Sequence, residues 1–404
     1  MKLTELPPLS LYVHIPWCIR KCPYCDFNSH EKRGEIPERE YVDALIADLE
    51  ASLPDVWGRS LHTIFIGGGT PSLFSPASIE RLIVAVRTRM KVDPGTEITM
   101  EANPGTFEIE RFRGFREAGV NRLSIGVQSF DDARLAAIGR VHGSDEARRA
   151  LAAALEIYPT VNADLMYALP GQRLDEAVLD VATAVAAGVP HISAYHLTLE
   201  PNTHFARFPP QLPGEDESAD MQEAIEGTLA AAGFEHYETS AFARPGHRAK
   251  HNVNYWTFGD YLGIGAGAHG KISFRDRIVR TERERKPQTF LSAALAGSAQ
   301  QARREVPEGE LPFEFMLNAL RLVEGFPVTL FAERTGLPIT AIEPQLAKAE
   351  SLGLLQRDHA RIGPSRKGER FLNDLLEMFL ASPGAPRRAA IPISISSPGT
   401  SRPS

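Results

Sequence analysis

The sequence predicts an α/β fold built round a parallel sheet, and three observations support this prediction. From residue 11 to about residue 200, short apolar segments alternate with stretches of helical periodicity, which is typical of a parallel sheet. Polar residues follow the apolar segments, as they do where a site forms at the carboxyl ends of strands. The alternation stops in a proline-rich segment, P-N-T-H-F-A-R-F-P-P. Six such units form either an open doubly wound sheet or an incomplete barrel.

Strands are expected at six apolar segments, which are residues 11–15, 62–66, 97–101, 121–127, 161–166 and 191–197. The first helix between them contains P-E-R-E-Y-V-D-A-L and places Tyr41, Leu45 and Leu49 on one face. The other helices are expected to begin near Ser75, Glu108, Asp131, Asp145 and Asp175. Ser75-Pro76 is a typical helix start, and Gly119 and Gly188 stand where helices end.

The cysteines are the strongest chemical signal in the chain. Cys18, Cys22 and Cys25 stand in a C-x3-C-x2-C spacing and are the only cysteines in 404 residues. Three thiols cannot form a closed disulfide framework, whereas three thiolates on one loop suit a soft metal or an iron–sulfur cluster. On a four-iron cluster they leave one iron open to an exchangeable ligand. A Cys3His zinc site with His14 is the alternative, but the apolar run L-Y-V-H-I-P favours a hydrogen-bonded core histidine.

The composition excludes several classes of function. The net charge of −7, from 44 basic and 51 acidic residues, argues against broad binding to nucleic acid or to anionic membranes. The start, M-K-L-T-E-L-P-P, lacks the apolar core of a signal peptide, and no apolar run is long enough to predict a transmembrane segment. A cytoplasmic location is therefore expected, with one large domain and a smaller one.

Polar groups occur at the carboxyl ends of the other predicted strands. G-G-G-T-P, residues 67–71, follows the second strand, Glu101 ends the third, Gln128 ends the fourth and Asp164 lies in the fifth. Each alone can be an ordinary loop contact, and a glycine cluster can be only a tight turn. Bare backbone at glycines also lets a ligand approach closely, although no G-K-[ST] follows to make a P-loop. Together with the cysteine loop, these groups predict a binding site at one end of the sheet.

At H-I-P-W-C-I-R-K-C-P-Y-C-D-F the chain resembles the radical S-adenosylmethionine (SAM) superfamily. It is most similar to the branch that contains oxygen-independent coproporphyrinogen III oxidase and the HemW-type heme chaperones. The resemblance implies a partial (β/α)6 TIM-type barrel and a [4Fe–4S] cluster on Cys18, Cys22 and Cys25. In that family an electron donor reduces the cluster, which then cleaves SAM to a 5′-deoxyadenosyl radical. The resemblance also implies a set of SAM contacts, which are Tyr12, Tyr24, Gly68, Gly69, Thr70, Glu101, Gln128, Arg140 and Asp164.

A second element, H-N-V-N-Y-W at residues 251–256, is shared with the same branch. On this resemblance His251 is a candidate axial ligand for heme iron, and Tyr255 and Trp256 are candidate stacking partners for a tetrapyrrole. Nearby basic residues, Arg244, Arg248 and Lys250, are candidates to meet propionates. The alternative is that these aromatic side chains only pack the sheet.

The chain divides into four predicted parts. Residues 1–200 form the radical-SAM partial barrel, 201–304 a sheet extension with the H-N-x-x-Y-W element, 305–380 a small helical, winged-helix-like C-terminal domain, and 381–404 a disordered tail. The C-terminal part contains a helix–turn–helix pattern, so a DNA-binding function competes there. The acidic charge disfavours it, and such scaffolds often serve only to pack.

Two functions of different classes remain, an enzyme and a binding protein. The oxidase decarboxylates coproporphyrinogen III, whereas the chaperone binds heme and passes it to an acceptor protein that the sequence does not identify. The oxidase motif carries a further cysteine two residues after the third, where this chain has Phe27. The oxidase also carries an extension before its cluster loop. Both differences match the chaperone, so we predict a heme chaperone and expect little or no oxidase activity. A radical-SAM enzyme acting on another substrate is the third possibility.

Overall fold

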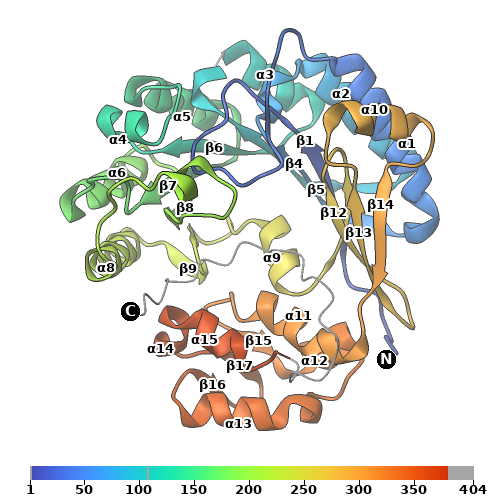
Figure 1. Ribbon diagram of the computed structural model, residues 1–404, viewed down its shortest axis with the longest axis vertical. Coiled ribbons are helices and arrows are strands. Elements are labelled where there is room, and N and C mark those ends of the chain that lie inside the picture. Colours follow the sequence, from blue (N-terminus) through green and yellow to red (C-terminus); the bar gives the residue numbers. More distant parts are fainter. Residues whose placement is uncertain (1, 107–108, 381–404) are drawn as a thin grey trace.

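The computed structural model describes residues 2–106 and 109–380, and the predicted tail at 381–404 lies outside the described residues. Its centre is a twelve-stranded sheet in the order β14-β13-β12-β11-β1-β4-β5-β6-β7-β8-β10-β9 (Figure 1). The six predicted strands are all confirmed, and they lie side by side in parallel. They are β1 (Leu9–Ile15), β4 (Ser60–Gly68), β5 (Lys91–Ala102), β6 (Arg122–Gln128), β7 (Thr160–Tyr167) and β8 (His191–His196).

Helices connect these strands where the sequence predicts them. They are α1 (Glu38–Val56), α2 (Pro76–Arg89), α3 (Ile109–Ala118), α4 (Asp132–Ala137), α5 (Ser144–Ile157) and α6 (Leu174–Ala186). The Ser75 hydroxyl accepts a hydrogen bond from the Ser78 N–H at 3.3 Å, and the Asp131 carboxylate accepts one from the Arg134 N–H at 2.9 Å. These caps satisfy N–H groups that have no partner within the first turn, which explains why the helices begin there.

The two faces of the parallel strands differ in polarity. In β1, Leu9, Leu11 and Val13 are buried in the main hydrophobic core, and Ser10 and His14 point to the opposite, inner face. In β5, Ile98 and Met100 join the same core, whereas Glu97 and Glu101 lie on the inner face. Side chains alternate along a strand, so one pattern supplies both an apolar outer face for the helices and a polar interior. The polar side chains that line the inner face are therefore available to bind a ligand there.

The sheet continues beyond the six units at both edges and does not close. Next to β1 lies β11 (Asp260–Ile264), also parallel, followed by antiparallel β12 (His269–Ser273), β13 (Ile278–Arg283) and β14 (Gln300–Glu305). Beyond β8 lie antiparallel β10 (Ala241–Ala243) and β9 (Glu235–Glu238). Helices α7 (His204–Arg207), α8 (Glu215–Ala231), α9 (Lys250–Trp256) and α10 (Pro287–Leu295) complete this part. The predicted incomplete barrel and its sheet extension are thereby confirmed.

The C-terminal part has a second hydrophobic core, to which Phe258 and Ile278 of the preceding part contribute. It comprises α11 (Leu311–Ala319), α12 (Val328–Thr335), α13 (Glu343–Ser351), α14 (Arg366–Arg370), α15 (Leu372–Glu377) and a small sheet of β15 (Phe326–Pro327), β17 (Arg361–Pro364) and β16 (Leu355–Arg357). Phe315 packs edge-on against Phe326 and Phe331, with ring centroids 5.0 and 5.2 Å apart. The helices and the β16–β17 hairpin confirm the winged-helix-like prediction. The exact boundaries near residues 200 and 305 stay a prediction.

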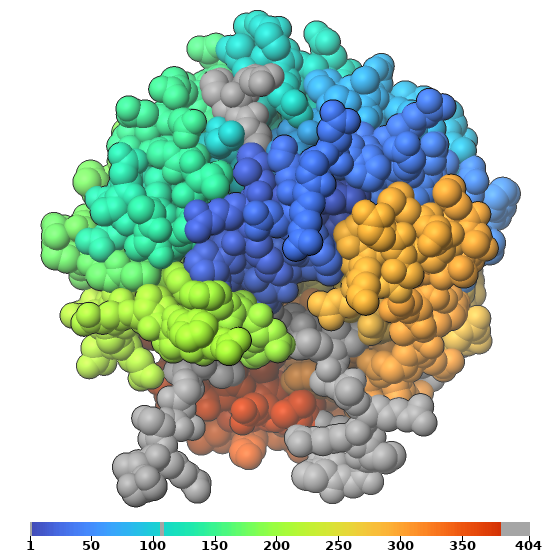
Figure 2. All heavy atoms as spheres, turned by 45° about the horizontal axis from the view of Figure 1, so that its top comes forward, coloured from blue at the N-terminus to red at the C-terminus, as the bar shows by residue number. Residues whose placement is uncertain are grey.

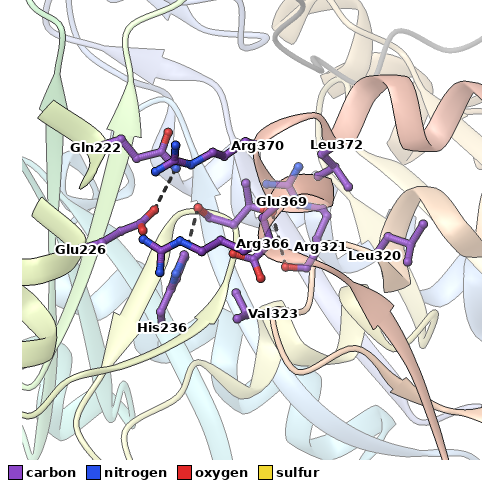
Figure 3. A pocket seen from close by; sticks show the side chains of 11 residues that line it. Gln222, Glu226, His236, Leu320, Arg321, Val323, Arg366, Glu369, Arg370 and Leu372 are labelled. Atoms are coloured by element: carbon purple, nitrogen blue, oxygen red, sulfur yellow. Dashed lines mark hydrogen bonds between the residues drawn. The ribbon is translucent and has the colours of Figure 1, made fainter. Parts of the chain in front are cut away.

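Charged side chains line the seam between the barrel and the C-terminal part. A small cavity of about 30 Å³ lies there, lined on one side by α8 and β9 and on the other by residues 320–323 and α14. Figure 3 shows the side chains that line it. Beside it the Arg370 guanidinium donates to the Glu223 carboxylate at 3.1 Å. In residues 2–106 and 109–380, no helix combines the length and the apolar character needed to cross a membrane.

Candidate iron–sulfur and SAM site

The cysteine loop leaves the end of β1 and is held by its own backbone. Short strands β2 (Trp17–Cys18) and β3 (His30–Glu31) pair in parallel within it. The His30 N–H donates to the Pro16 carbonyl at 2.7 Å, and the Lys32 N–H donates to the Cys18 carbonyl at 2.9 Å. The Lys21 ammonium donates to the carbonyls of Phe27 and Ser29, both at 3.2 Å. The loop is therefore braced by its own hydrogen bonds.

Each of the three half-buried thiols has a polar group beside its sulfur. The Thr70 hydroxyl donates to Cys18 Sγ at 3.6 Å, Arg140 Nη1 donates to Cys22 Sγ at 3.6 Å, and the Ser29 hydroxyl lies 3.5 Å from Cys25 Sγ. Hydrogen bonds to the sulfurs are one way in which proteins tune iron–sulfur clusters. Burial raises the pKa of Cys18 to about 11 and raises the pKa of Cys25, so metal binding has to displace protons here. These residues fit the predicted [4Fe–4S] cluster, which stays a prediction.

His14 lies beside the loop as a core histidine. Its Nε2 contacts the Asn28 carbonyl at 2.9 Å and its Nδ1 contacts the Tyr12 hydroxyl at 3.0 Å, so both ring nitrogens have protein partners. Burial lowers the pKa of His14 to about 4. Among the residues that the structure describes, no three His, Cys, Asp or Glu side chains gather round one single-ion centre. In this arrangement His14 has no nitrogen left for the Cys3His alternative.

The glycine motif packs directly on the cysteine strand. A Cβ on Gly68, whose φ is +117°, would lie 2.7 Å from the His14 ring, and a Cβ on Gly69 would lie 2.5 Å from the Trp17 carbonyl oxygen. The N–H groups of Gly69 and Thr70 donate to the carbonyls of Ile15 and Trp17, both at 2.7 Å. Close packing against the His14 ring and the positive φ therefore require glycine at 68, and close packing against backbone requires glycine at 69. The predicted contact of this motif with SAM stays a prediction.

Two carboxyl groups lie together on the inner face. Glu101 Oε2 accepts a hydrogen bond from the Gly68 N–H at 3.0 Å, and burial together with the nearby Asp164 raises the pKa of Glu101 to about 8. Asp164 accepts from the Ser124 hydroxyl and the Asn162 amide, both at 2.8 Å, and burial raises its pKa as well. Two buried carboxyls that resist ionisation suit a cationic ligand, because a positive charge would favour their ionised forms. SAM carries a sulfonium and an ammonium group.

We predict that Glu101 makes SAM binding depend on pH. Below pH 8 most of the free protein carries a neutral Glu101, and a cationic ligand has to displace that proton. The affinity should therefore rise between pH 6 and pH 7.5, by at most about tenfold per pH unit. Calorimetry in buffers of different ionisation enthalpy should detect proton release. Glu101→Gln should flatten this dependence, whereas Glu80→Gln, on exposed α2 surface, should leave it intact. A steep dependence in Glu101→Gln would contradict the assignment.

Arg140 and Tyr24 lie beside Cys22, and the Gln128 amide and the Arg140 guanidinium both lie against Gly126. Arg140 Nη2 donates to the Gly126 carbonyl at 2.8 Å and to the Asn103 amide oxygen, and its buried Nε has no partner among the described residues. Burial would lower the pKa of Arg140, but Tyr24 and Cys22 raise it overall. Gln128 has a φ of +69°, which is unusual for a side-chain-bearing residue. Arg140 therefore already contacts a cysteine, and its predicted contact with the SAM carboxylate would use the remaining Nε–H.

The structure separates the H-N-V-N-Y-W element from these residues. The element forms α9, and the His251 imidazole lies against Thr63, near the beginning of β4. Gly67 lies four residues further along the strand, a distance of about 13 Å at 3.3 Å per residue. The cysteine loop and most SAM candidates thus lie at one end of the barrel and His251 below them. Tyr12 is the exception, because its ring packs on Phe65, which also stacks on His251.

Several residues that hold the cysteine loop were missed by sequence reasoning. Asn28 Nδ2 donates to the carbonyls of Ala266 and Arg285, both at 2.9 Å, and the Tyr41 hydroxyl donates to the His14 carbonyl at 2.8 Å. The segment G-I-G-A-G-A-H-G passes beneath the loop, with a φ of +102° at Gly265 and +78° at Gly267. Its repeated glycines were the one signal in the sequence for such a close approach.

Comparison with known proteins agrees with this geometry. Residues 12–182 match the model of the radical SAM superfamily, and residues 306–371 match the HemN C-terminal domain. The chain is 49% identical to the heme chaperone HemW of Escherichia coli strain K12, over 94% of this chain and 100% of that protein. It is 34% identical to the HemW of Bacillus subtilis strain 168, over 92% of this chain and 99% of that protein. The solved structure of coproporphyrinogen III oxidase (HemN) from Escherichia coli superposes with a TM-score of 0.79 at 23% identity, covering 93% of this chain and 90% of that one, which shows the shared fold.

Proposed function

The chain belongs to the family of HemW heme chaperones, and we propose that it likewise binds heme and passes it to an acceptor protein. The observation that supports a specific binding residue is the state of His251. Its imidazole is 3% exposed and its Nε2 has no hydrogen-bond partner among the described residues. A buried nitrogen without a partner is uncommon and calls for an explanation. The explanation we propose is that His251 Nε2 binds heme iron.

The hydrogen bonds round His251 define its tautomer. The Thr63 hydroxyl donates its proton to the Ser10 hydroxyl at 2.7 Å, so it can only accept from His251 Nδ1, also at 2.7 Å. The proton is then on Nδ1 and the lone pair on Nε2. Burial lowers the pKa of His251 to about 3, which keeps the ring neutral. A neutral imidazole whose other nitrogen donates a hydrogen bond is the usual form of a metal-ligating histidine.

The surroundings of His251 are aromatic. Its ring stacks on Phe65, with centroids 4.8 Å apart, and meets the edge of Tyr255 at 4.9 Å. Trp256 lies on the same short helix under the Arg321 guanidinium, 4.4 Å from its ring centre. Flat aromatic faces and a cation suit a tetrapyrrole with propionates. Because His251 is buried, heme iron reaches Nε2 only after neighbouring side chains move, so we infer that α9 opens when heme binds.

The radical-SAM part completes the proposal. Cys18, Cys22 and Cys25 would hold a [4Fe–4S] cluster, and the Glu101–Asp164 pair would face the cationic groups of SAM. When bound and reduced, these groups supply one-electron chemistry. Within the chain, Arg140 and Thr70 would direct hydrogen bonds at two cluster sulfurs. An electron donor is a further implied partner, and three free thiols suit the reducing environment of the cytoplasm.

A second candidate, oxygen-independent coproporphyrinogen III oxidase, rests on the shared fold. Phe27 occupies the position of the extra cysteine in the oxidase motif, and its ring is 65% exposed beside the loop. A phenyl ring cannot replace a thiol in metal or redox chemistry, so Phe27 favours the chaperone.

We expect the anaerobically reconstituted wild type to bind close to one heme per chain. His251→Ala should shift the Soret band or weaken heme binding at least tenfold, because it removes the proposed iron ligand while the cysteine loop stays intact. The matched control is His62→Ala, which removes an exposed histidine close to His251. It should leave the spectrum unchanged.

A parallel assay with SAM, reductant and coproporphyrinogen III separates the two candidates. Little or no decarboxylation is expected. Robust formation of protoporphyrinogen IX would overturn the chaperone proposal. If His251→Ala binds heme with the affinity and spectrum of the wild type, the chaperone proposal stands, but the iron ligand is a residue other than His251.

A further inference from the structure

An exposed aromatic residue stands beside the cysteine loop, on a surface that differs in charge from the rest of the chain. Figure 2 shows this loop in blue at the centre of one face, between the segment that contains α7 and the segment that contains α10. Phe27 is 65% exposed and Ile19 is 36% exposed. Both belong to the loop that carries the three cysteines, so whatever touches them approaches the proposed cluster directly.

Basic side chains surround these two apolar residues. Arg20 lies between the first two cysteines, and the Lys32 N–H bonds to the Cys18 carbonyl, which places Lys32 and Arg33 at the same loop. The Asn28 amide bonds to the Arg285 carbonyl, which brings Arg285 and Lys286 alongside. The side chains of all five are exposed, and none forms an ion pair in residues 2–106 and 109–380. We call Ile19, Arg20, Phe27, Lys32, Arg33, Arg285 and Lys286 the loop patch.

The charge of the loop patch opposes that of the whole protein. In residues 18–35 and 285–286 there are six exposed cations, counting Lys21, and three exposed acids, Asp26, Glu31 and Glu35. The chain as a whole has 44 basic and 51 acidic residues. A local excess of positive charge on an acidic protein attracts a negatively charged partner and raises its association rate.

The backbone of Phe27 is held by two hydrogen bonds. The Ser29 N–H donates to its carbonyl at 2.6 Å and the Lys21 ammonium donates to the same carbonyl at 3.2 Å. An exposed aromatic side chain on a braced backbone loses little conformational freedom on binding, which is typical of residues that dominate interfaces.

We propose that the loop patch is the docking surface for the electron donor, an acidic one-electron carrier protein that places its redox group next to the cysteine loop. The carrier gives up one electron and the cluster takes it up, so the exchange balances without another reactant. The apolar pair would form the dry centre of the contact and the basic residues its rim. This inference rests on the proposed cluster and is independent of heme binding.

The test compares two reductants on the anaerobically reconstituted protein. The loop variant is Arg20→Glu, Lys32→Glu and Arg33→Glu combined. The matched control reverses three exposed cations elsewhere, Lys91, Arg149 and Lys348. Stopped-flow bleaching of the cluster is followed with a reduced acidic flavoprotein of the flavodoxin type. It is followed separately with dithionite at high ionic strength, where the negative charge of dithionite is screened and no docking surface is needed.

The loop variant should react with the flavoprotein at least about tenfold more slowly at low ionic strength, and added salt should narrow the difference. Its reaction with dithionite and its heme binding should match the wild type, as should every rate of the control variant. Phe27→Ala should weaken binding of the oxidised flavoprotein, measured by calorimetry, at low and high salt alike.

The proposal would be overturned by a loop variant that reacts with the flavoprotein at the wild-type rate. It would also be overturned if the control variant reacted as slowly as the loop variant. If the loop variant assembles no cluster, its affinity for the flavoprotein is measured by calorimetry instead. An affinity equal to that of the wild type would again overturn the proposal.

Discussion

Replacing Cys22 with Ser is expected to abolish the iron–sulfur cluster, with complete loss of the brown chromophore and of the EPR signal of the reduced protein. The chain has three cysteines, and a [4Fe–4S] cluster with an open iron needs a thiolate on each of the other three irons. A serine hydroxyl does not ionise near neutral pH and is a poor ligand for a soft metal. The same result is expected for Cys18→Ser and Cys25→Ser.

Thr70→Val is the matched control for the cysteine variants. It removes the hydroxyl that donates to Cys18 Sγ while keeping the volume of the side chain. The cluster should assemble in normal amount, and its reduction potential should fall, since hydrogen bonds to the sulfur stabilise the reduced state. Iron and sulfide analysis and a redox titration check both parts. Stoichiometric zinc without iron after anaerobic reconstitution of the wild type would contradict the cluster prediction.

Asp260→Ala is expected to destabilise the protein by about 3–5 kcal/mol, because it leaves buried cations without their counter-ion. Asp260 is fully buried at the start of β11 and accepts from Arg59 at 2.7 Å, from Lys271 at 3.0 Å and from both the N–H and the hydroxyl of Ser273. Burial alone would raise its pKa, but Lys271 and Arg59 lower it. Lys271 is 1% exposed, and burial lowers its pKa to about 8. Chemical denaturation followed by circular dichroism measures the loss.

Two further variants show whether the buried charge is the cause. Asp276→Ala removes a carboxylate that pairs with Arg277 on the surface, and it should change the free energy of unfolding by less than about 0.5 kcal/mol. Adding Lys271→Met to Asp260→Ala removes the stranded ammonium and should recover part of the loss. A loss in Asp260→Ala no larger than in Asp276→Ala would refute the role of this ion pair.

The order of strands and helices could be predicted from the sequence because it depends on local periodicity. The buried faces of β1 and β5, the caps at Ser75 and Asp131 and the glycines at 119 and 188 are all encoded within a few neighbouring residues. The cysteine triplet could be recognised for the same reason. The fact that polar residues share one end of the barrel followed from the parallel arrangement of the strands.

Contacts between distant segments could be found only in the tertiary structure. The sequence does not reveal that the Asn28 amide donates to the Ala266 carbonyl or that the Tyr41 hydroxyl donates to the His14 carbonyl. Nor does it reveal that Asp260 forms ion pairs with Arg59 and Lys271. It identified His251 as a candidate ligand but not its burial, its tautomer or its distance from the cysteines. Hydrogen bonding and burial depend on which residues the fold brings within a few ångströms, and here some of those residues lie 257 positions apart along the chain. The sequence alone therefore determined the fold class, the family and the candidate ligands, while the tertiary structure decided which of these residues lie close together and how deeply they are buried.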